Sequence, residues 1–363
     1  MLTILFDGIA YGMLLFVLAC GLSVTLGLMN FINLAHGSFA MAGGYCTVIL
    51  VNRVGVPFAL GLPLAFLVTA ALGGLLERTL YVHVYARSHL DQVLFTIGLV
   101  FMSVAATDYV MGSSQQFVQI PNALQGKFDV FGIGMGKYRL LIIVICGALT
   151  VALQLILAKT RFGSRLRAAV DNDQVARGLG INVGAVFGIT FAFGSGLAGL
   201  GGALGAEILG LDPTFPLKYM IYFLIVVTVG GTSSITGPFV ASILLGIGDV
   251  AGKYYVPKLG AFVIYTIMIV ILIWRPRGLF ARPGQDQMEP EQLEIAPLVL
   301  KYFAKIRRRA YDFVEFIRRF GMRADRSSES IDDRAGGVAG SHIPAHGSEG
   351  DDGKNDDTGA VTQ

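Results

Sequence analysis

The chain offers few residues whose types and spacing could perform covalent chemistry. Among its 363 residues it has three cysteines, Cys20, Cys46 and Cys146, far apart in apolar segments, which predicts packing roles rather than a metal or redox pair. The sequence contains no HExxH, GxSxG or paired CxxC pattern and no GxxxxGK(S/T) phosphate loop. We therefore expect no enzyme activity, no ATPase motif, no catalytic residue, no metal site and no cofactor in this chain.

A glycine pattern at residues 194–199 matches a nucleotide-binding motif by its letters. Gly194, Gly196 and Gly199 spell GxGxxG, and Asp212 follows at about the distance of a ribose contact. A dinucleotide site needs a strand, a turn and a helix within a soluble βαβ unit. Here apolar sequence continues to Ala206, so we expect one spanning helix whose glycines let neighbouring helices approach closely.

Three polar residues near the start of a predicted span are candidates for a role in transport. Asn30, Asn33 and His36 recur at three-residue spacing and would share one face of a helix. Two interpretations are open. The side chains hydrogen-bond to one another and to neighbouring backbone, fixing how the first two spans pack, or they line a translocation path.

A glycine-rich stretch, VGGTSSITGP at 229–238, has the same two interpretations. Interrupted helices expose backbone groups that can bind substrate near the membrane midplane, and glycines also permit close packing. The candidates for the path from this stretch are Gly230, Gly231, Thr232 and Ser233. Charge is scarce in the predicted spans, which fits a neutral or zwitterionic solute.

The least apolar stretch of the membrane part is RAAVDNDQVARGLGIN at 167–182. Asp171 and Gln174 stand three residues apart, as in a capping box, and Gly180 supplies the left-handed conformation that commonly ends a helix. Its apolar residues would cluster on one side: Val175, Ala176 and Leu179. Isolated helices shorter than ~12–15 residues are marginal in water. This helix therefore needs support, either from the chain's own helix ends or from a separate cytoplasmic protein.

The composition defines the elements that carry these residues. Hydrophobic residues make up 54% of the chain and charged residues 15%, against about 25% charged in soluble domains. Apolar runs near the ~20 residues that cross a bilayer recur along it. The clearest spans are 8–28, 35–51, 58–76, 92–111, 139–158, 184–206 and 259–274. The uncharged run 219–248 predicts two short helices joined by GGTSSITGP. We expect an all-α polytopic membrane protein of about eight or nine transmembrane or half-spanning helices.

Basic residues predict the orientation of these helices. The loop 159–183 has the densest basic content of the membrane part, which places it in the cytoplasm. Counting spans from that loop puts the N-terminus outside. If 219–248 forms two short spans or a re-entrant pair, the basic segment 275–282 and the C-terminus lie inside.

The composition changes after Arg282 and predicts three parts. Residues 1–282 form the transmembrane domain. Residues 283–323 form a cytoplasmic tail with a basic amphipathic helix at 297–320, suited to the anionic leaflet, to a partner or to the chain's own surface. Residues 324–363 are rich in Ser, Gly and Asp and are predicted to be disordered.

The charged stretch resembles the cytoplasmic coupling loop of binding-protein-dependent ABC importer permeases. Their pattern is E-A-A-x-x-x-G, and Gln174, Val175, Ala176 and Gly180 take those places. The sequence of this stretch is similar to that of the branched-chain amino-acid permeases, which have an acidic residue, an alanine and then L-G-I-N. Asp171, Ala176 and the LGIN of 179–182 fit that pattern. Four further stretches resemble the same family, in order: NFINLAHGSFAMAGGY (30–45), ERTLYVHVYAR (77–87), VGGTSSITGP (229–238) and RPRGLF (275–280). The chain departs from the family pattern at Val-His-Val in 77–87.

The resemblance implies a membrane permease subunit of an ABC importer for branched-chain or other hydrophobic amino acids. It also implies a second permease subunit, two ATP-binding cassette subunits that bind ATP and Mg, and an extracytoplasmic solute-binding protein, in the bacterial cytoplasmic membrane. The coupling contacts to the cassettes would be Asp171, Gln174, Val175, Ala176, Arg177, Leu179 and Gly180. Membrane lipid is a further expected partner, and no nucleic acid is expected. Two alternatives are a permease of the same family for urea or short amides and a self-sufficient secondary transporter or channel.

Overall fold

The structure is a computed structural model that describes residues 1–280, apart from 30, 86, 131–132, 232–235 and 277. All described residues belong to one compact unit, Met1–Pro283. The predicted tail, with its amphipathic helix at 297–320 and its disordered end at 324–363, lies outside the described residues.

Helices make up nearly all of the described part. The long helices are α1 (Leu2–Met29), α2 (His36–Val48), α3 (Phe58–Thr79), α4 (His89–Met111), α5 (Lys137–Lys159), α8 (Val183–Leu209), α9 (Phe215–Gly230), α10 (Thr236–Tyr255) and α11 (Gly260–Trp274). The short elements are η1 (Ile49–Arg53), η2 (Tyr81–His83), η3 (Asn122–Leu124), α6 (Arg161–Asp171), α7 (Asp173–Gly178) and the antiparallel hairpin β1 (Lys127–Val130) with β2 (Ile133–Gly136). Local signals set these boundaries. Ser88, for example, is the N-cap of α4, and its hydroxyl oxygen accepts a hydrogen bond from the Asp91 amide (3.2 Å).

The prediction of a polytopic α-helical membrane protein is confirmed. Within the described residues, α1, α3, α4, α5 and α8 are long and apolar enough to cross a membrane, and α9 and α11 are shorter apolar helices. The uncharged run 219–248 does contain two helices, α9 and α10, on either side of the glycine-rich stretch. The second of these helices was predicted to end with the run at 248, which is too early, because α10 continues to Tyr255.

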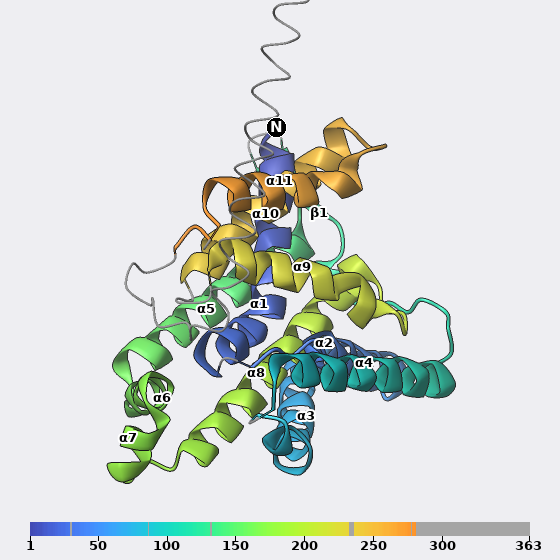
Figure 1. The fold of residues 1–363 in the computed structure, drawn as a ribbon. Coiled ribbons are helices and arrows are strands. Elements are labelled where there is room, and N and C mark those ends of the chain that lie inside the picture. Colours follow the sequence, from blue (N-terminus) through green and yellow to red (C-terminus); the bar gives the residue numbers. More distant parts are fainter. Residues whose placement is uncertain (30, 86, 131–132, 232–235, 277, 281–363) are drawn as a thin grey trace, which may run out of the picture. The chain divides into compact units, whose positions relative to one another are not determined.

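The helices divide into a buried centre and an apolar periphery. The apolar window of α1 is 78% buried and that of α8 is 61% buried, against 11% for α4 and 22% for α5. Large apolar side chains on α4 and α5, such as Phe101, Met102, Val144 and Val151, are more than half exposed. Helices that are apolar on their outer face belong in lipid. Figure 1 shows α8 running beside α2 and α3, and α1 passes through the centre of the unit.

The GxGxxG pattern lies in the middle of α8 and packs helices together, as predicted. Gly194 lies against Gly21 of α1, and Gly199 lies against Thr69 of α3 and Gly43 of α2. A Cβ added to Gly199 would overlap the Thr69 hydroxyl, and one added to Gly43 would overlap the Gly199 backbone. The residues around it are helical throughout, so the strand and turn of a dinucleotide site are absent from 183–209.

We predict that Gly199→Leu destabilises the protein severely. Overpacking costs ~1–3 kcal/mol, and here the added Cβ would overlap the Thr69 side chain of α3. The measurement is the amount of monodisperse protein extracted from membranes and its thermal midpoint. Gly147→Leu on α5 is the matched control, since a Cβ at Gly147 meets nothing within 4 Å. A Gly199→Leu protein as abundant and as stable as the control would contradict the packing role.

Candidate functional site

The charged stretch 167–182 folds into two short helices rather than one. α6 ends at Asp171, and the six-residue helix α7 starts at Asp173. The prediction that Asp171 caps α7 was wrong. The N-cap is Asn172, whose extended backbone separates the helices and whose side-chain oxygen accepts from the Val175 amide (2.9 Å). The Asn172 amide still donates to the Ala168 carbonyl (3.2 Å), so α6 extends through the residue predicted as the cap.

The predicted end of the helix at Gly180 is confirmed. Gly180 has a φ of 79°, its amide donates to the Arg177 carbonyl (3.0 Å), and the Ile181 amide donates to the Ala176 carbonyl (3.0 Å). This pair of bonds is the Schellman arrangement, which needs a residue in the left-handed region. Ile181 also packs against a small apolar cluster that contains Ala176 and Val183. The cap therefore closes the helix and anchors the chain that leaves it.

The sequence predicted that Val175, Ala176 and Leu179 cluster on one side of the short helix, and this was wrong. Leu179 is the C-cap residue of α7. Ala176 is 2% exposed and holds the helix against its own chain, whereas Val175 is 57% and Leu179 76% exposed. Asp173 and Arg177 form an exposed pair one turn apart (3.6 Å), of a kind worth about 0.3–0.5 kcal/mol. The chain thus supports α7 through one alanine and presents two larger apolar side chains outward.

Two caps in three residues join α7 to the central helix. Gly180 ends α7, and Asn182 begins α8 by accepting a hydrogen bond from the Ala185 amide (3.0 Å). The stretch L-G-I-N therefore has a direct structural reason: a left-handed cap, an apolar anchor and an N-cap follow one another. The connection between α7 and the glycine-packed helix α8 is therefore short and capped at both ends.

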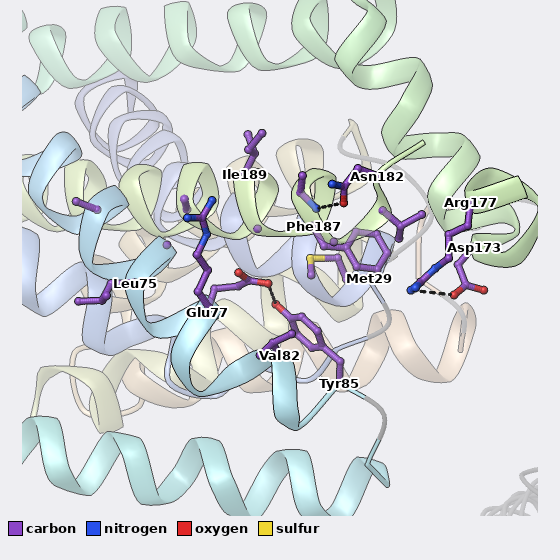
Figure 2. Close-up of a pocket in the computed structure, with 18 residues that line it drawn as sticks. Met29, Leu75, Glu77, Val82, Tyr85, Asp173, Arg177, Asn182, Phe187 and Ile189 are labelled. Carbon is purple, nitrogen blue, oxygen red and sulfur yellow. Dashed lines mark hydrogen bonds and ion pairs between the residues drawn. The ribbon is translucent and has the colours of Figure 1, made fainter. Parts of the chain in front are cut away.

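A hollow of about 1070 Å³ opens beside α7, between the end of α3 and the start of α8. Figure 2 shows Asp173 and Arg177 at one edge, with Glu77 and Tyr85 on the facing wall. The Tyr85 hydroxyl donates to the Glu77 carboxylate (3.3 Å), and Glu77 is only 4% exposed. Glu77 fits there because α8 has a glycine opposite it, Gly188, whose added Cβ would lie 2.9 Å from the carboxylate.

The described polar residues of the first spans are buried and bonded. Asn33 is 1% exposed and accepts from the Tyr81 hydroxyl (3.2 Å). His36 is 2% exposed, and its Nε2 donates to the Leu18 carbonyl of α1 (2.9 Å). The His36 bond ties α2 to α1, as the packing interpretation expects. The prediction that these residues share one face of a helix was wrong for Asn33, because α2 begins only at His36 and Asn33 bonds instead to the side chain of Tyr81. Asn30 lies outside the described residues, and the path role of the three stays a prediction.

The first residues of the glycine-rich stretch, 229–231, contact a segment from the far end of the domain. The Leu279 amide donates to the Val229 carbonyl (2.8 Å), and the Phe280 amide donates to the Gly230 carbonyl (3.3 Å). Gly231 has a φ of 88° and lies against Gly278. Leu279 and Phe280 therefore satisfy carbonyls at the end of α9. Thr232 and Ser233 lie outside the described residues, so the path role of this stretch also stays a prediction.

The stretches that carry the family resemblance meet in pairs. Leu279 and Phe280 cap the end of α9. Tyr81 contacts the loop before α2: its hydroxyl donates to Asn33, and its ring packs edge-on against Phe31, with 5.6 Å between the ring centroids. Sequence reasoning missed Gln92, which is 3% exposed and joins the same two loops. Its side chain accepts from the Ile32 amide (3.3 Å) and donates to the Arg87 carbonyl (3.2 Å). A polar residue just inside an apolar span was the available signal.

We predict that Gly180→Val loosens the end of α7. A side chain in the left-handed region costs ~1–2 kcal/mol, which raises local opening about 5- to 30-fold. Hydrogen exchange of the peptide that covers 173–182, in nanodiscs, measures this opening. Gly178→Val is the control, because Gly178 lies inside α7, is not among the positive-φ glycines, and has nothing within 4 Å of an added Cβ. Equal exchange in the two variants would contradict the capping role.

The fold and these sites define a class of protein: a polytopic helical membrane protein with a short capped helix attached rigidly to its central helix. The chain belongs to the branched-chain amino acid transport system permease component family, whose model matches residues 4–272. It is 26% identical to the high-affinity branched-chain amino acid transport system permease protein BraD of Pseudomonas aeruginosa, over 78% of this chain and 97% of BraD.

Two relatives from Escherichia coli K12 give a further comparison. The high-affinity branched-chain amino acid transport system permease protein LivH is 25% identical over 78% of this chain and 96% of LivH. The permease protein LivM of a system with the same name is 26% identical over 74% of this chain and 68% of LivM. The chain thus matches nearly the whole of LivH and about two thirds of LivM.

Proposed function

We propose that this chain is the membrane permease subunit of an ABC importer for branched-chain or other hydrophobic amino acids. It would work with separate ATP-binding subunits, which bind ATP and Mg, and with an extracytoplasmic solute-binding protein. Membership of the permease family supports the transport role, and the similarity to BraD and LivH, both named for branched-chain amino acid transport, supports the substrate class.

The observation that carries the coupling proposal is the exposed face of α7. A six-residue helix cannot persist alone in water, yet the chain buries only Ala176 of it. Val175 and Leu179 are exposed beside the paired charges of Asp173 and Arg177. An apolar patch rimmed by charge is typical of a protein interface. We assign this face to an ATP-binding subunit.

The link between α7 and α8 gives the proposed coupling a mechanical route. Force applied to α7 would pass through the caps at Gly180 and Asn182 into α8, with little lost in a flexible loop. α8 packs on α1, α2 and α3, so it would carry those helices with it. Closure of the ATP-binding subunits would then tip part of the bundle as a rigid body, between outward- and inward-facing states.

The basic residues near α7 support the proposed orientation. The loop 159–183 contains Lys159 and four arginines, and such loops stay in the cytoplasm. Figure 1 shows the N-terminus and α7 at opposite ends of the unit, which fits an N-terminus outside the cell. We propose the bacterial cytoplasmic membrane as the location. The second permease would be a member of the same family, by analogy with the two E. coli permeases.

We predict that the double variant Val175→Asp with Leu179→Asp uncouples the permease without unfolding it. Burying two apolar side chains contributes roughly 3 kcal/mol or more, so the charges should weaken cassette binding by at least about a hundredfold. The measurements are co-purification of the ATP-binding subunits and uptake of labelled leucine. Val54→Asp is the control, since Val54 is 64% exposed and lies outside the α6–α7 region.

Reconstitution tests the proposed class directly. Proteoliposomes with this chain, a second permease, the ATP-binding subunits and the solute-binding protein should take up leucine only with ATP. Gradient-driven leucine flux through this chain alone would overturn the proposal in favour of a secondary transporter. Full uptake by the double variant would overturn the docking role of α7 alone.

A further inference from the structure

A second cavity, of about 310 Å³, lies away from α7 and outside every stretch that carries the family resemblance. It is lined by the first turns of α1, the start of α5, the end of α8, and parts of α9 and α10. Its volume is at the low end of the ~300–1,000 Å³ typical of small-molecule sites. A cavity of this size fits one amino acid rather than a peptide.

One wall of this cavity contains a buried carboxylate that is only partly paired. The side chain of Asp249 is 1% exposed, and its Oδ2 accepts from Lys253 Nζ at 2.5 Å. Its Oδ1 is buried and has no hydrogen-bond partner among the described residues. A buried carboxylate oxygen without a donor is costly, so a site that keeps one is prepared for a donor from outside the chain.

Another residue lining the cavity offers the opposite charge. Arg139, from the start of α5, pairs with Asp7 of α1. A guanidinium has five N–H donors in a fixed fork, so one ion pair leaves donors for a second carboxylate. The side chain of Arg139 is 41% exposed and is therefore accessible to a ligand that arrives from water.

The partners of these two charged groups, Lys253 and Asp7, also line the cavity, and the rest of the lining is aromatic and apolar. Tyr11 and Tyr219 belong to it, and Lys253 Nζ lies 5.6 Å from the centre of the Tyr11 ring. Leu209 and Val250 add aliphatic surface. An acceptor, a donor and apolar walls are the three features that a hydrophobic α-amino acid would use: ammonium, carboxylate and side chain.

We propose that this cavity binds the zwitterionic backbone of a hydrophobic α-amino acid. Asp249 accepts from the ammonium group and Arg139 donates to the carboxylate. The proposal rests on the proposed transport function and deepens it, because it names the groups that select the solute. It also separates α-amino acids from urea and short amides, which have neither charge.

The test is a ligand panel on the permease–cassette complex in nanodiscs, without the solute-binding protein. Displacement of tritiated leucine is measured with three competitors of the same skeleton: leucine, isocaproate, which lacks the ammonium group, and leucinamide, which lacks the carboxylate. The wild type should bind leucine at least about thirtyfold more tightly than either analogue, since isocaproate leaves the buried Asp249 oxygen without a donor and leucinamide gives Arg139 no second carboxylate. Equal affinity for all three, or no leucine binding, overturns the proposal without any variant.

Two variants then assign each charge. Asp249→Asn should abolish the preference for leucine over isocaproate and keep the preference over leucinamide, and Arg139→Gln should do the reverse. Asp212→Asn is the matched control, because Asp212 pairs with Lys218 at 2.5 Å but does not line the cavity. A mere helix-locking role would change the affinity for all three ligands equally, and that result overturns the proposal. If the complex imports leucine with ATP while both variants keep wild-type selectivity, the site assignment fails and the transport function stands.

Discussion

The close approach of α8 to three other helices is the constraint on which the rest of the structure depends. Lipid tails are as apolar as leucine side chains, so helices in a membrane associate by tight packing rather than by a hydrophobic driving force. Gly194 and Gly199 provide that packing, because α1 and α3 occupy the space that their side chains would fill and Gly43 of α2 lies against the Gly199 backbone. The central helix is therefore fixed to its neighbours along its middle, and it can move only with them.

This packing gives the short helix α7 its proposed importance. α8 starts at Val183 with Asn182 as its N-cap, and the chain leaves α7 through the left-handed cap at Gly180. A partner that moves α7 would act on a helix that is already locked into the bundle. Contacts between distant loops fix other parts of the structure in a similar way. Tyr81 reaches Asn33, and Leu279 satisfies a carbonyl at the end of α9, so loops distant in sequence hold one another in place.

Much of the fold could be predicted from the sequence because the bilayer imposes its own length on apolar runs. The spans, the two short helices of 219–248 and the packing role of the glycines all follow from local composition. The boundary at Asp171 was missed by one residue, since two adjacent candidates could each cap a helix and only the extent of α6 decides between them. Periodicity likewise could not tell which of Val175, Ala176 and Leu179 faces the chain.

The least predictable features were two buried carboxyl side chains, Asp249 and Glu77. Asp249 marked the expected end of an apolar run, but α10 continues past it because Lys253, one turn later, offsets its charge. Which helices close around such a carboxylate depends on long-range packing, as does the placement of Glu77 opposite a glycine of α8. Local sequence reports neither, so both the hollow beside α7 and the charged cavity required the fold.

The central claim is that the exposed face of α7 binds an ATP-binding subunit. The most direct measurement is cysteine cross-linking in intact membranes, with Leu179→Cys on α7 and Val54→Cys, outside the α6–α7 region, as the comparison. The account predicts a Leu179→Cys cross-link to the ATP-binding subunit and none from Val54→Cys. A Leu179→Cys that reacts with solvent reagents yet never cross-links to that subunit in a transporting complex would contradict it.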